Sequence, residues 1–208
     1  MTPFVLETDH GPAHAHVHEA HAPRGALVLG HGAGGGVDAP DLIAARDIAL
    51  SAGFSVALVE QPYRVAGRRS PAPAWQLDVA WMQVVDGLRE RWFHELPLVV
   101  GGRSSGARVA CRTVSATGAV GVLCLAFPLQ PPQGKRPEPR PSRLAELETV
   151  TVPTLVVQGE RDPFGIPPAG ERRTVLLIPG DHSLRRGLGN AAPEVVAWLQ
   201  ARANPRGT

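Results

Sequence analysis

A serine flanked by glycines is the first feature of this sequence that could carry out chemistry. Residues 102–106 read Gly-Arg-Ser-Ser-Gly, a G-x-S-x-G pentapeptide centred on Ser104. An apolar run precedes it and a helix is predicted over 105–115, which together make the strand–turn–helix setting of a nucleophile elbow. Ser104 is therefore the predicted nucleophile, whereas Ser105 lacks a glycine two residues before it. A structural Gly/Ser turn is the alternative without chemistry.

A serine at its ordinary pKa needs a general base, and that base needs an acid to orient it. Asp162 and His182 each follow a short apolar run. The carboxyl ends of parallel strands meet at one edge of a sheet, where catalytic residues of open α/β sheets gather. We predict that His182 accepts the serine proton and that Asp162 fixes its tautomer. Glu160 and Asp181 are rival acids, and Asp181 is the poorer orienter because it adjoins the histidine.

A glycine-rich loop could supply the amide groups that stabilise an oxyanion. Residues 31–36 read His-Gly-Ala-Gly-Gly-Gly and follow an apolar run. This pattern is typical of the loop that donates one backbone N–H in acyl transfer. We predict Ala33 as that donor, with Gly34 as the alternative, and the N–H of Ser105 as the second donor. A phosphate cradle is a weaker alternative, because neither a P-loop ending nor dinucleotide-binding spacing is present.

The rest of the chain alternates apolar runs with amphipathic segments. Uniformly apolar runs suit strands buried on both faces of a parallel sheet, and apolar residues three and four apart indicate helices. The alternation predicts the α/β class, with a mostly parallel, doubly wound sheet in one domain over 1–208. Asp38 is the predicted N-cap of the first helix. Strands are expected at 25–30, 54–60, 96–101, 119–127, 154–158 and 173–178, and helices between 38 and 53 and at 77–92, 105–115, 144–148 and 192–203.

Residues 1–24 are predicted to contribute an antiparallel strand pair, from 4–7 and 13–19. His14, His16 and His18 alternate with apolar residues, so they share one face of the second strand. Such imidazoles could ligate a transition metal, but no acidic or cysteine ligand joins them at suggestive spacing. Solvated histidines on an edge strand are the preferred interpretation. The sequence predicts neither a metal nor another cofactor.

Composition excludes several classes of function. The chain has 208 residues, of which 43% are hydrophobic, and its net charge of +2 is too small for a nucleic-acid footprint. No apolar run approaches the roughly 20 residues of a membrane span, and the first residues do not read as a signal peptide. Cys111 and Cys124 fall in expected core elements as buried, reduced thiols. These features predict a cytoplasmic protein with a small-molecule substrate and no nucleic-acid or membrane partner. They do not indicate an oligomeric state.

Taken in order, these motifs resemble the α/β-hydrolase superfamily from about Gly25 to Leu199. The sequence is most similar to small lidless members, namely the KANL/Tex α/β-hydrolase-like family and dienelactone-hydrolase-like proteins. The order serine, aspartate, histidine is also that of the superfamily. The resemblance implies an α/β-hydrolase fold with no cap domain. It rests on LVLGHGAGGG (27–36), QPYRVAGRR (61–69), GGRSSGARVA (101–110), FPLQPPQGK (127–135), VQGERDPFG (157–165) and PGDHSL (179–184).

The sequence departs from these relatives in two places. Ser105 and Ala107 stand where relatives more often have Met and Gly, and neither change removes a backbone N–H. Relatives usually place a helix between the acid and the last strand, whereas residues 163–172 leave room for one turn at most. The parallel crossover is still long enough to be made.

The resemblance also bears on the substrate. Lids of the superfamily follow the strand at 119–127, where this chain has the Pro-rich segment 128–141, which is too short for a helical cap. An open site suits small soluble esters or thioesters. Tyr63 and Arg64 are expected at its mouth, as a hydrogen-bond donor and a contact for an anionic group, with solvated loop residues as the alternative. The predicted function is a serine hydrolase that forms an acyl-enzyme. An acyltransferase with the same triad and a catalytically silent partner-binding scaffold are the alternatives.

Overall fold

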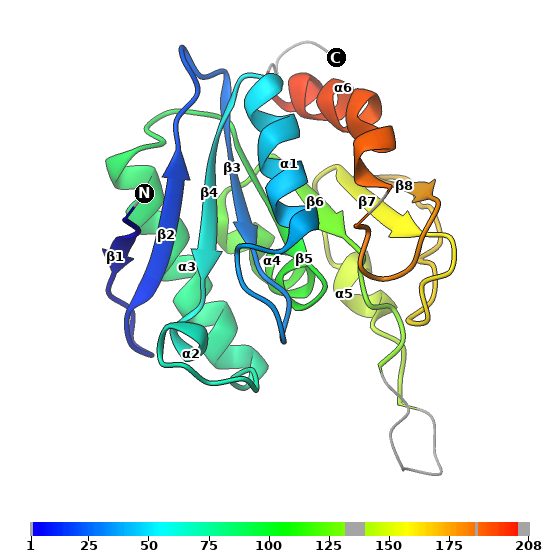
Figure 1. The fold of residues 1–208 in the computed structure, drawn as a ribbon, viewed down its shortest axis with the longest axis horizontal. Helices are drawn as coiled ribbons and strands as arrows, with labels where there is room; N and C mark the ends of the chain where they lie inside the picture. Colours follow the sequence, from blue (N-terminus) through cyan, green and yellow to red (C-terminus); the bar gives the residue numbers. More distant parts are fainter. Residues whose placement is uncertain (1, 132–139, 186, 204–208) are drawn as a thin grey trace.

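One eight-stranded sheet runs through the molecule (Figure 1). The structure is a computed structural model that describes residues 2–131, 140–185 and 187–203. The strand order is β1-β2-β4-β3-β5-β6-β7-β8; β3 to β8 are parallel, and β1 and β2 are antiparallel to their neighbours. The strands are β1 (Phe4–Leu6), β2 (Ala13–His18), β3 (Gly25–Gly30), β4 (Phe54–Glu60), β5 (Leu98–Arg103), β6 (Gly121–Leu125), β7 (Thr154–Gly159) and β8 (Arg173–Ile178). The predicted fold class is confirmed.

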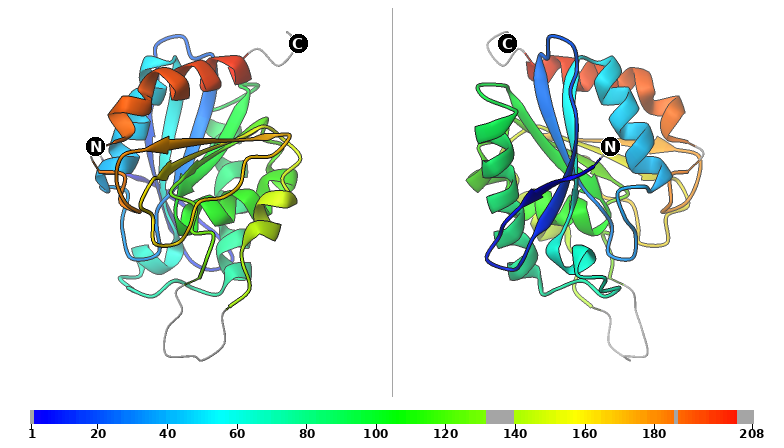
Figure 2. Two further views of the ribbon diagram at one scale, coloured as in Figure 1. Left: turned by 90° about the vertical axis from the view of Figure 1, so that its right-hand side faces the viewer. Right: turned by 60° about the vertical axis from the view of Figure 1, so that its left-hand side comes forward.

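Helices cover both faces of this sheet (Figure 2). They are α1 (Pro40–Ser51), α2 (Pro62–Val65), α3 (Ala74–Arg91), α4 (Ser105–Thr117), α5 (Leu144–Glu148) and α6 (Ala192–Ala203), which follows a short 3₁₀ turn at Leu188–Ala191. One hydrophobic cluster packs beneath α3 and α4, and a second packs beneath α1 and α6. Within the described residues, no helix combines the length and the apolar character needed to cross a membrane.

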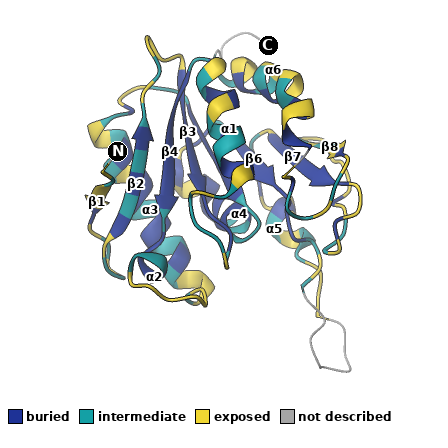
Figure 3. Cartoon of the chain, in the orientation of Figure 1, coloured by how far each residue is buried: buried dark blue, intermediate teal, exposed yellow. Residues whose placement is uncertain are grey.

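The burial of β2, β3 and β6 follows the side-chain pattern of each strand. The uniformly apolar strands β3 and β6 are buried along their whole length, and the centre of the sheet is the most deeply buried part of the fold (Figure 3). In β2, alanines and a valine face the core while His14, His16 and His18 stay partly exposed, as their alternation predicts. His14 and His16 lie 3.5 and 3.3 Å from a carboxylate oxygen of Glu60. Among the described residues, no group of three or more His, Cys, Asp or Glu side chains could hold a metal ion.

Several local predictions are wrong. Strand β5 covers Leu98–Arg103 rather than 96–101, and α3 covers Ala74–Arg91 rather than 77–92. Asp38 does not cap α1, because the helix begins at Pro40 with Ala39 in the N-cap position and no side-chain cap. Asp38 thus lies one residue before the N-cap position, and Asp41 supplies the acidic group of the first turn. Strand β6 ends at Leu125 rather than at residue 127, because Ala126 has a φ of 50° and turns the chain.

Two further predictions concern the cysteines and the lid position. Cys111 and Cys124 are buried free thiols whose Sγ atoms lie 3.6 Å apart, in agreement with their expected core placement. The Pro-rich segment 128–141 lies mostly outside the described residues, which exclude 132–139. The fold carries no cap domain on the part of the chain that the structure describes.

Candidate active site

Ser104 stands in a strained turn between β5 and α4. Its φ of 51° and ψ of −105° are unusual for a residue with a side chain. The flanking glycines are needed because the turn packs against the end of β3. A Cβ on Gly102 would lie 2.4 Å from the Gly30 carbonyl oxygen, and one on Gly106 would lie 2.3 Å from it. The G-x-S-x-G spacing thus lets the backbone approach closely and leaves Ser104 at the turn's apex.

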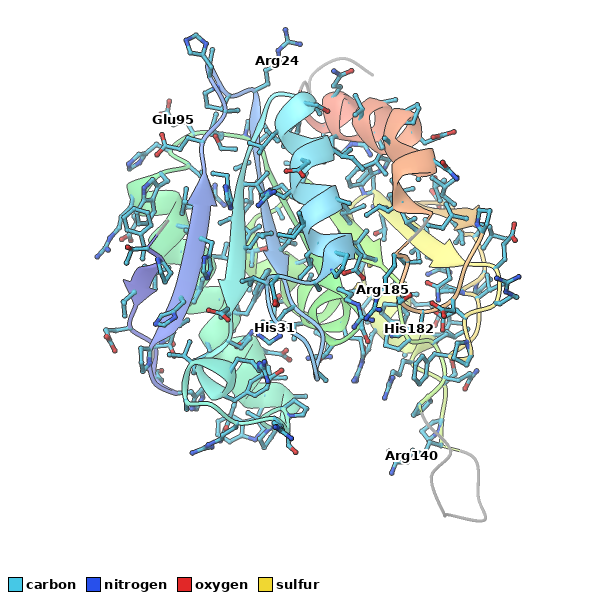
Figure 4. All side chains as sticks on the ribbon, in the orientation of Figure 1. Arg24, His31, Glu95, Arg140, His182 and Arg185 are labelled. Carbon is cyan, nitrogen blue, oxygen red and sulfur yellow. The ribbon has the colours of Figure 1, made fainter. Side chains whose placement is uncertain are left out.

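The structure brings Ser104, His182 and Asp162 together at the carboxyl edge of the sheet. Ser104 Oγ lies 3.0 Å from His182 Nε2, and His182 Nδ1 lies 2.7 Å from Asp162 Oδ2. An ionised Asp162 accepts from Nδ1–H, which leaves Nε2 to accept a hydrogen bond from the serine hydroxyl. Figure 4 shows His182 and His31 at this edge, opposite Arg24 and Glu95.

Asp162 is held by three donors. Besides His182, Gln158 Nε2 donates to Oδ2 at 2.7 Å and the Phe164 N–H donates to Oδ1 at 2.8 Å. The carboxylate side chain is fully buried, and Gln158 is also 0% exposed. Gln158 Nε2 has two further acceptors, the carbonyl oxygens of Phe127 and Gly165 at 3.1 and 3.0 Å. This network orients the carboxylate before any substrate binds.

The rival acids do not contact the histidine. Asp181 is exposed and accepts from both the N–H and the hydroxyl of Ser183, at 2.9 and 2.6 Å. These hydrogen bonds lower the pKa of Asp181. Glu160 is exposed at the end of β7. On the other side of His182, the ring of Phe164 packs edge-on at a centroid distance of 4.5 Å. Asp162 is therefore the acid that the geometry favours.

The glycine-rich loop after β3 is tied to the segment that follows β4. His31 is buried; its Nδ1 donates to the Gly32 carbonyl oxygen at 2.8 Å, and its Nε2 accepts from the Gln61 N–H at 3.1 Å. Burial lowers the pKa of His31, which favours this neutral form. The Tyr63 hydroxyl donates to the Ala33 carbonyl oxygen at 3.0 Å. Two of the loop's carbonyl groups are thus held by side chains, one by His31 at the start of the loop and one by Tyr63 outside it.

The predicted oxyanion donors lie in two segments, Ser105 directly after Ser104, and Ala33 and Gly34 in the loop that follows β3. Ser105 is the first residue of α4, so its amide belongs to a helix N-terminus, where N–H groups lack intrahelical partners. Within the described part of the chain, the amides of Ala33, Gly34 and Ser105 donate no hydrogen bond. All three remain free for an acceptor, and their role toward an oxyanion stays a prediction.

The two residues expected at the mouth of the site differ in exposure. Tyr63 is only 5% exposed and its hydroxyl proton is engaged by Ala33, so it does not point freely toward a substrate. Arg64 is half-buried, and its guanidinium reaches the Arg68 carbonyl oxygen at 3.5 Å. Contact between Arg64 and a substrate stays a prediction.

An ion pair that the sequence did not reveal connects three parts of the site. Arg103, which precedes the nucleophile, donates to the buried carboxylate of Asp41 at 2.8 Å and to the His182 carbonyl oxygen at 3.4 Å. Burial raises the pKa of Asp41, and the Arg103 guanidinium opposes that rise. The pair joins α1, the nucleophile turn and the histidine loop.

Sequence reasoning also missed Gln158 and the contacts of His31. The sequence did hold a signal for Gln158, which is a polar residue at the end of an apolar strand and lies four positions before the acid. Nothing in the sequence pairs Arg103 with Asp41, because the two residues are 62 positions apart and meet only through the fold.

Comparison with known proteins agrees with this architecture. Residues 23–187 match the family described as alpha/beta hydrolase domain. Similar solved structures include XC6422 from Xanthomonas campestris, described as a serine hydrolase without a lid, with 17% identity, coverage of 99% of this chain and 94% of that chain, and a TM-score of 0.74. Est1E from Butyrivibrio proteoclasticus has 12% identity, 97% and 99% coverage and a TM-score of 0.79. Dienelactone hydrolase from Anabaena variabilis has 15% identity, 96% and 98% coverage and a TM-score of 0.72.

The family match spans most of the chain and includes Ser104, Asp162 and His182. The solved structures cover nearly the whole of this chain and of their own chains, and at these identities they establish the fold. The chain therefore belongs to the alpha/beta hydrolase family, as a small member without a lid.

Proposed function

We propose that this hydrolase cleaves small soluble esters or thioesters through an acyl-enzyme on Ser104. The observation that carries the proposal is the continuous hydrogen-bonded chain from Ser104 Oγ through His182 to Asp162, with distances of 3.0 and 2.7 Å. The chain begins at a serine in a strained turn and ends at a fully buried carboxylate. A serine, a base and an orienting acid in this geometry constitute a Ser-His-Asp triad.

In the proposed acylation step, Ser104 Oγ attacks the carbonyl carbon of the ester while His182 Nε2 takes the hydroxyl proton. Asp162 stays ionised and stabilises the imidazolium. The tetrahedral intermediate collapses, the C–O or C–S bond to the leaving group breaks, and the imidazolium returns its proton to the leaving group. Water then attacks the acyl-enzyme with His182 as the base, which releases the acid and restores Ser104.

The developing oxyanion is assigned to the amides of Ser105 and Ala33, with Gly34 as the alternative. Loss of one such donor typically costs about 10²- to 10³-fold in kcat. Support for this assignment comes from the position of Ser105 at the start of α4 and from the tethered loop that carries Ala33.

The proposed substrate class follows from the lack of a lid. Long acyl chains need an apolar enclosure, and the described residues provide no cap domain above Ser104. The short segment 128–141 is the only insertion at the usual lid position. Acetate and butyrate esters are therefore the expected substrates, and long-chain triglycerides are expected to be poor ones.

The deciding experiment combines fluorophosphonate labelling with hydrolysis of p-nitrophenyl acetate, for wild type and Ser104→Ala. The expected result is labelling of the wild type and its loss in the variant, with kcat lowered by a factor on the order of 10⁴ to 10⁶. Ser115→Ala, at an exposed serine near the other end of α4, is the control and should behave as wild type. A folded wild type that is neither labelled nor active would overturn the proposal and favour a partner-binding scaffold.

A further inference from the structure

Tyr63 makes a contact that the mechanism above does not use. It lies in the short helix α2, is 5% exposed and packs in the same hydrophobic cluster as Leu77 and Trp81. Its hydroxyl is directed at the glycine-rich loop, where it donates to the Ala33 carbonyl oxygen at 3.0 Å. A tyrosine anchored in the core thus holds the backbone of a loop at the nucleophile.

The loop has little else to hold this peptide group. A Cβ built on Gly34 or Gly35 would meet no atom within 4 Å, so neighbouring side chains do not confine the backbone there. Glycine residues also tolerate both signs of φ, so the peptide between residues 33 and 34 could rotate with little steric penalty. The hydrogen bond from Tyr63 is the contact that opposes this rotation.

The direction of the Ala33 carbonyl matters because a trans peptide is planar, with its C=O and N–H on opposite sides. Fixing the Ala33 oxygen toward Tyr63 fixes the Gly34 N–H in the opposite direction. In the same way, the Gly32 oxygen accepts from His31 Nδ1 at 2.8 Å and from the Gly35 N–H at 3.2 Å, which fixes the Ala33 N–H. The Ala33 N–H is thereby oriented by His31 and Gly35 within the loop, and the Gly34 N–H by Tyr63 from outside it.

We propose that Tyr63 is a positioning residue for the oxyanion hole, which acts by holding the Ala33 carbonyl away from the reacting oxygen. The inference rests on the proposed serine-hydrolase function and reassigns Tyr63 from substrate contact to loop support. Rotation of this peptide would direct a carbonyl oxygen, rather than an N–H, toward the developing negative charge. Burial raises the pKa of Tyr63 to about 12, so the phenol keeps its proton as a donor throughout the neutral pH range.

The test is Tyr63→Phe, which keeps the ring in the core and removes only the hydroxyl. The net contribution of one neutral hydrogen bond corresponds to about a 3- to 10-fold shift between two peptide orientations. We expect kcat for p-nitrophenyl acetate to fall by up to about 10-fold, because the population of the competent orientation cannot fall by more than the shift itself. KM should change little, because the aligned amide acts on the transition state.

A second substrate distinguishes positioning from general damage. A thionoester develops its charge on sulfur, which accepts hydrogen bonds weakly, so its turnover depends less on the oxyanion hole. The ratio of oxygen-ester to thionoester rates should therefore fall in Tyr63→Phe, whereas a merely structural defect would lower both rates alike. Ser51→Ala is the matched control, because it removes a hydroxyl-to-carbonyl hydrogen bond of 2.7 Å at the far end of α1. It should leave kcat and the ratio unchanged.

Crystal structures of wild type and Tyr63→Phe add a readout independent of activity. The expected result is a rotated or doubly occupied peptide between residues 33 and 34 in the variant. A single wild-type orientation in Tyr63→Phe, or an unchanged ratio of ester to thionoester rates, would overturn the positioning role. An inactive, unlabelled wild type would instead remove the proposed function, and the peptide orientation would still decide whether Tyr63 sets the loop.

Discussion

Replacing Asp162 with asparagine exchanges one carboxylate oxygen for an NH₂ group and keeps the shape of the side chain. All three neighbours of this side chain are donors in the structure: His182 and Gln158 at Oδ2, and the Phe164 N–H at Oδ1. An asparagine offers one oxygen and one NH₂ group to these three donors. The consequence for His182 depends on which of the two positions the NH₂ group occupies.

The two orientations differ in what they leave unpaired. With its NH₂ toward Phe164, asparagine would place two donors 2.8 Å apart and leave a largely buried N–H unsatisfied, at a cost of about 1–3 kcal/mol. With its NH₂ toward His182, asparagine also places two donors 2.7 Å apart, its own NH₂ and Gln158 Nε2. The Gln158 side chain can shift away and keep its acceptors on Phe127 and Gly165, whereas the Phe164 N–H belongs to the backbone. The second orientation is the cheaper one. It forces the proton of His182 onto Nε2, which then cannot accept the serine proton.

We therefore expect Asp162→Asn to fold and to lose activity through the wrong histidine tautomer. The comparable change in a serine protease lowers kcat by about 10⁴-fold, which corresponds to about 5.4 kcal/mol of transition-state stabilisation. The free energy of unfolding should fall by about 1–3 kcal/mol for the altered hydrogen bonding.

The assay is kcat/KM for p-nitrophenyl acetate at neutral pH, together with the rate of fluorophosphonate labelling and the melting temperature. Asp181→Asn is the matched control, since it alters an exposed carboxylate next to His182 that bonds only Ser183 among the described residues. It should retain activity. If Asp162→Asn kept activity within about ten-fold of wild type, the tautomer reasoning would be refuted. Loss of activity in Asp181→Asn instead would identify the other carboxylate as the acid.

Two further predictions concern titration and thiol chemistry. Because burial lowers the pKa of His31, the unfolded chain binds a proton there below pH about 6.5 that the folded chain excludes. The stability that His31→Gln loses relative to wild type should therefore shrink as the pH falls from 7 to 5.5 in urea unfolding. Ser115→Ala, which removes no titratable group, is the control and should show no such change. Cys111 and Cys124 are buried, and their mutual contact together with burial raises the pKa of Cys124. Neither thiol should react with a disulfide reagent until the protein is unfolded, and rapid reaction of the native protein would contradict the packed arrangement.

Much of the fold could be predicted from residue patterns because the central strands are buried on both faces. Uniformly apolar runs such as 25–30 have no solvated side to interrupt them, so they are visible without any knowledge of their neighbours. The boundaries of β8 and α5 agree with the predicted ranges. The predicted N-cap of α1, Asp38, was wrong. The position of the cap depends on the backbone geometry at Ala39 and Pro40 and not only on an aspartate nearby.

The sequence by itself determined the chemistry-bearing residues whose local setting is diagnostic. A serine between glycines at the end of an apolar run, and an acid and a histidine after later runs, suffice to name Ser104, Asp162 and His182, because the ends of parallel strands meet at one edge. Their hydrogen-bond distances could not be read from the sequence.

Only the tertiary structure decided which polar groups support that site. Gln158 binds Asp162, Arg103 binds Asp41, and Tyr63 binds the Ala33 carbonyl oxygen. Two of these contacts, the Arg103 ion pair and the Tyr63 hydrogen bond, join segments that are 62 and 30 positions apart in the chain. Pairings between distant residues depend on strand order and on the approach of loops at the sheet edge. Neither is encoded in the local pattern around any one residue. The residues proposed to do the chemistry were therefore recognisable in advance, whereas those that contact and orient them were not.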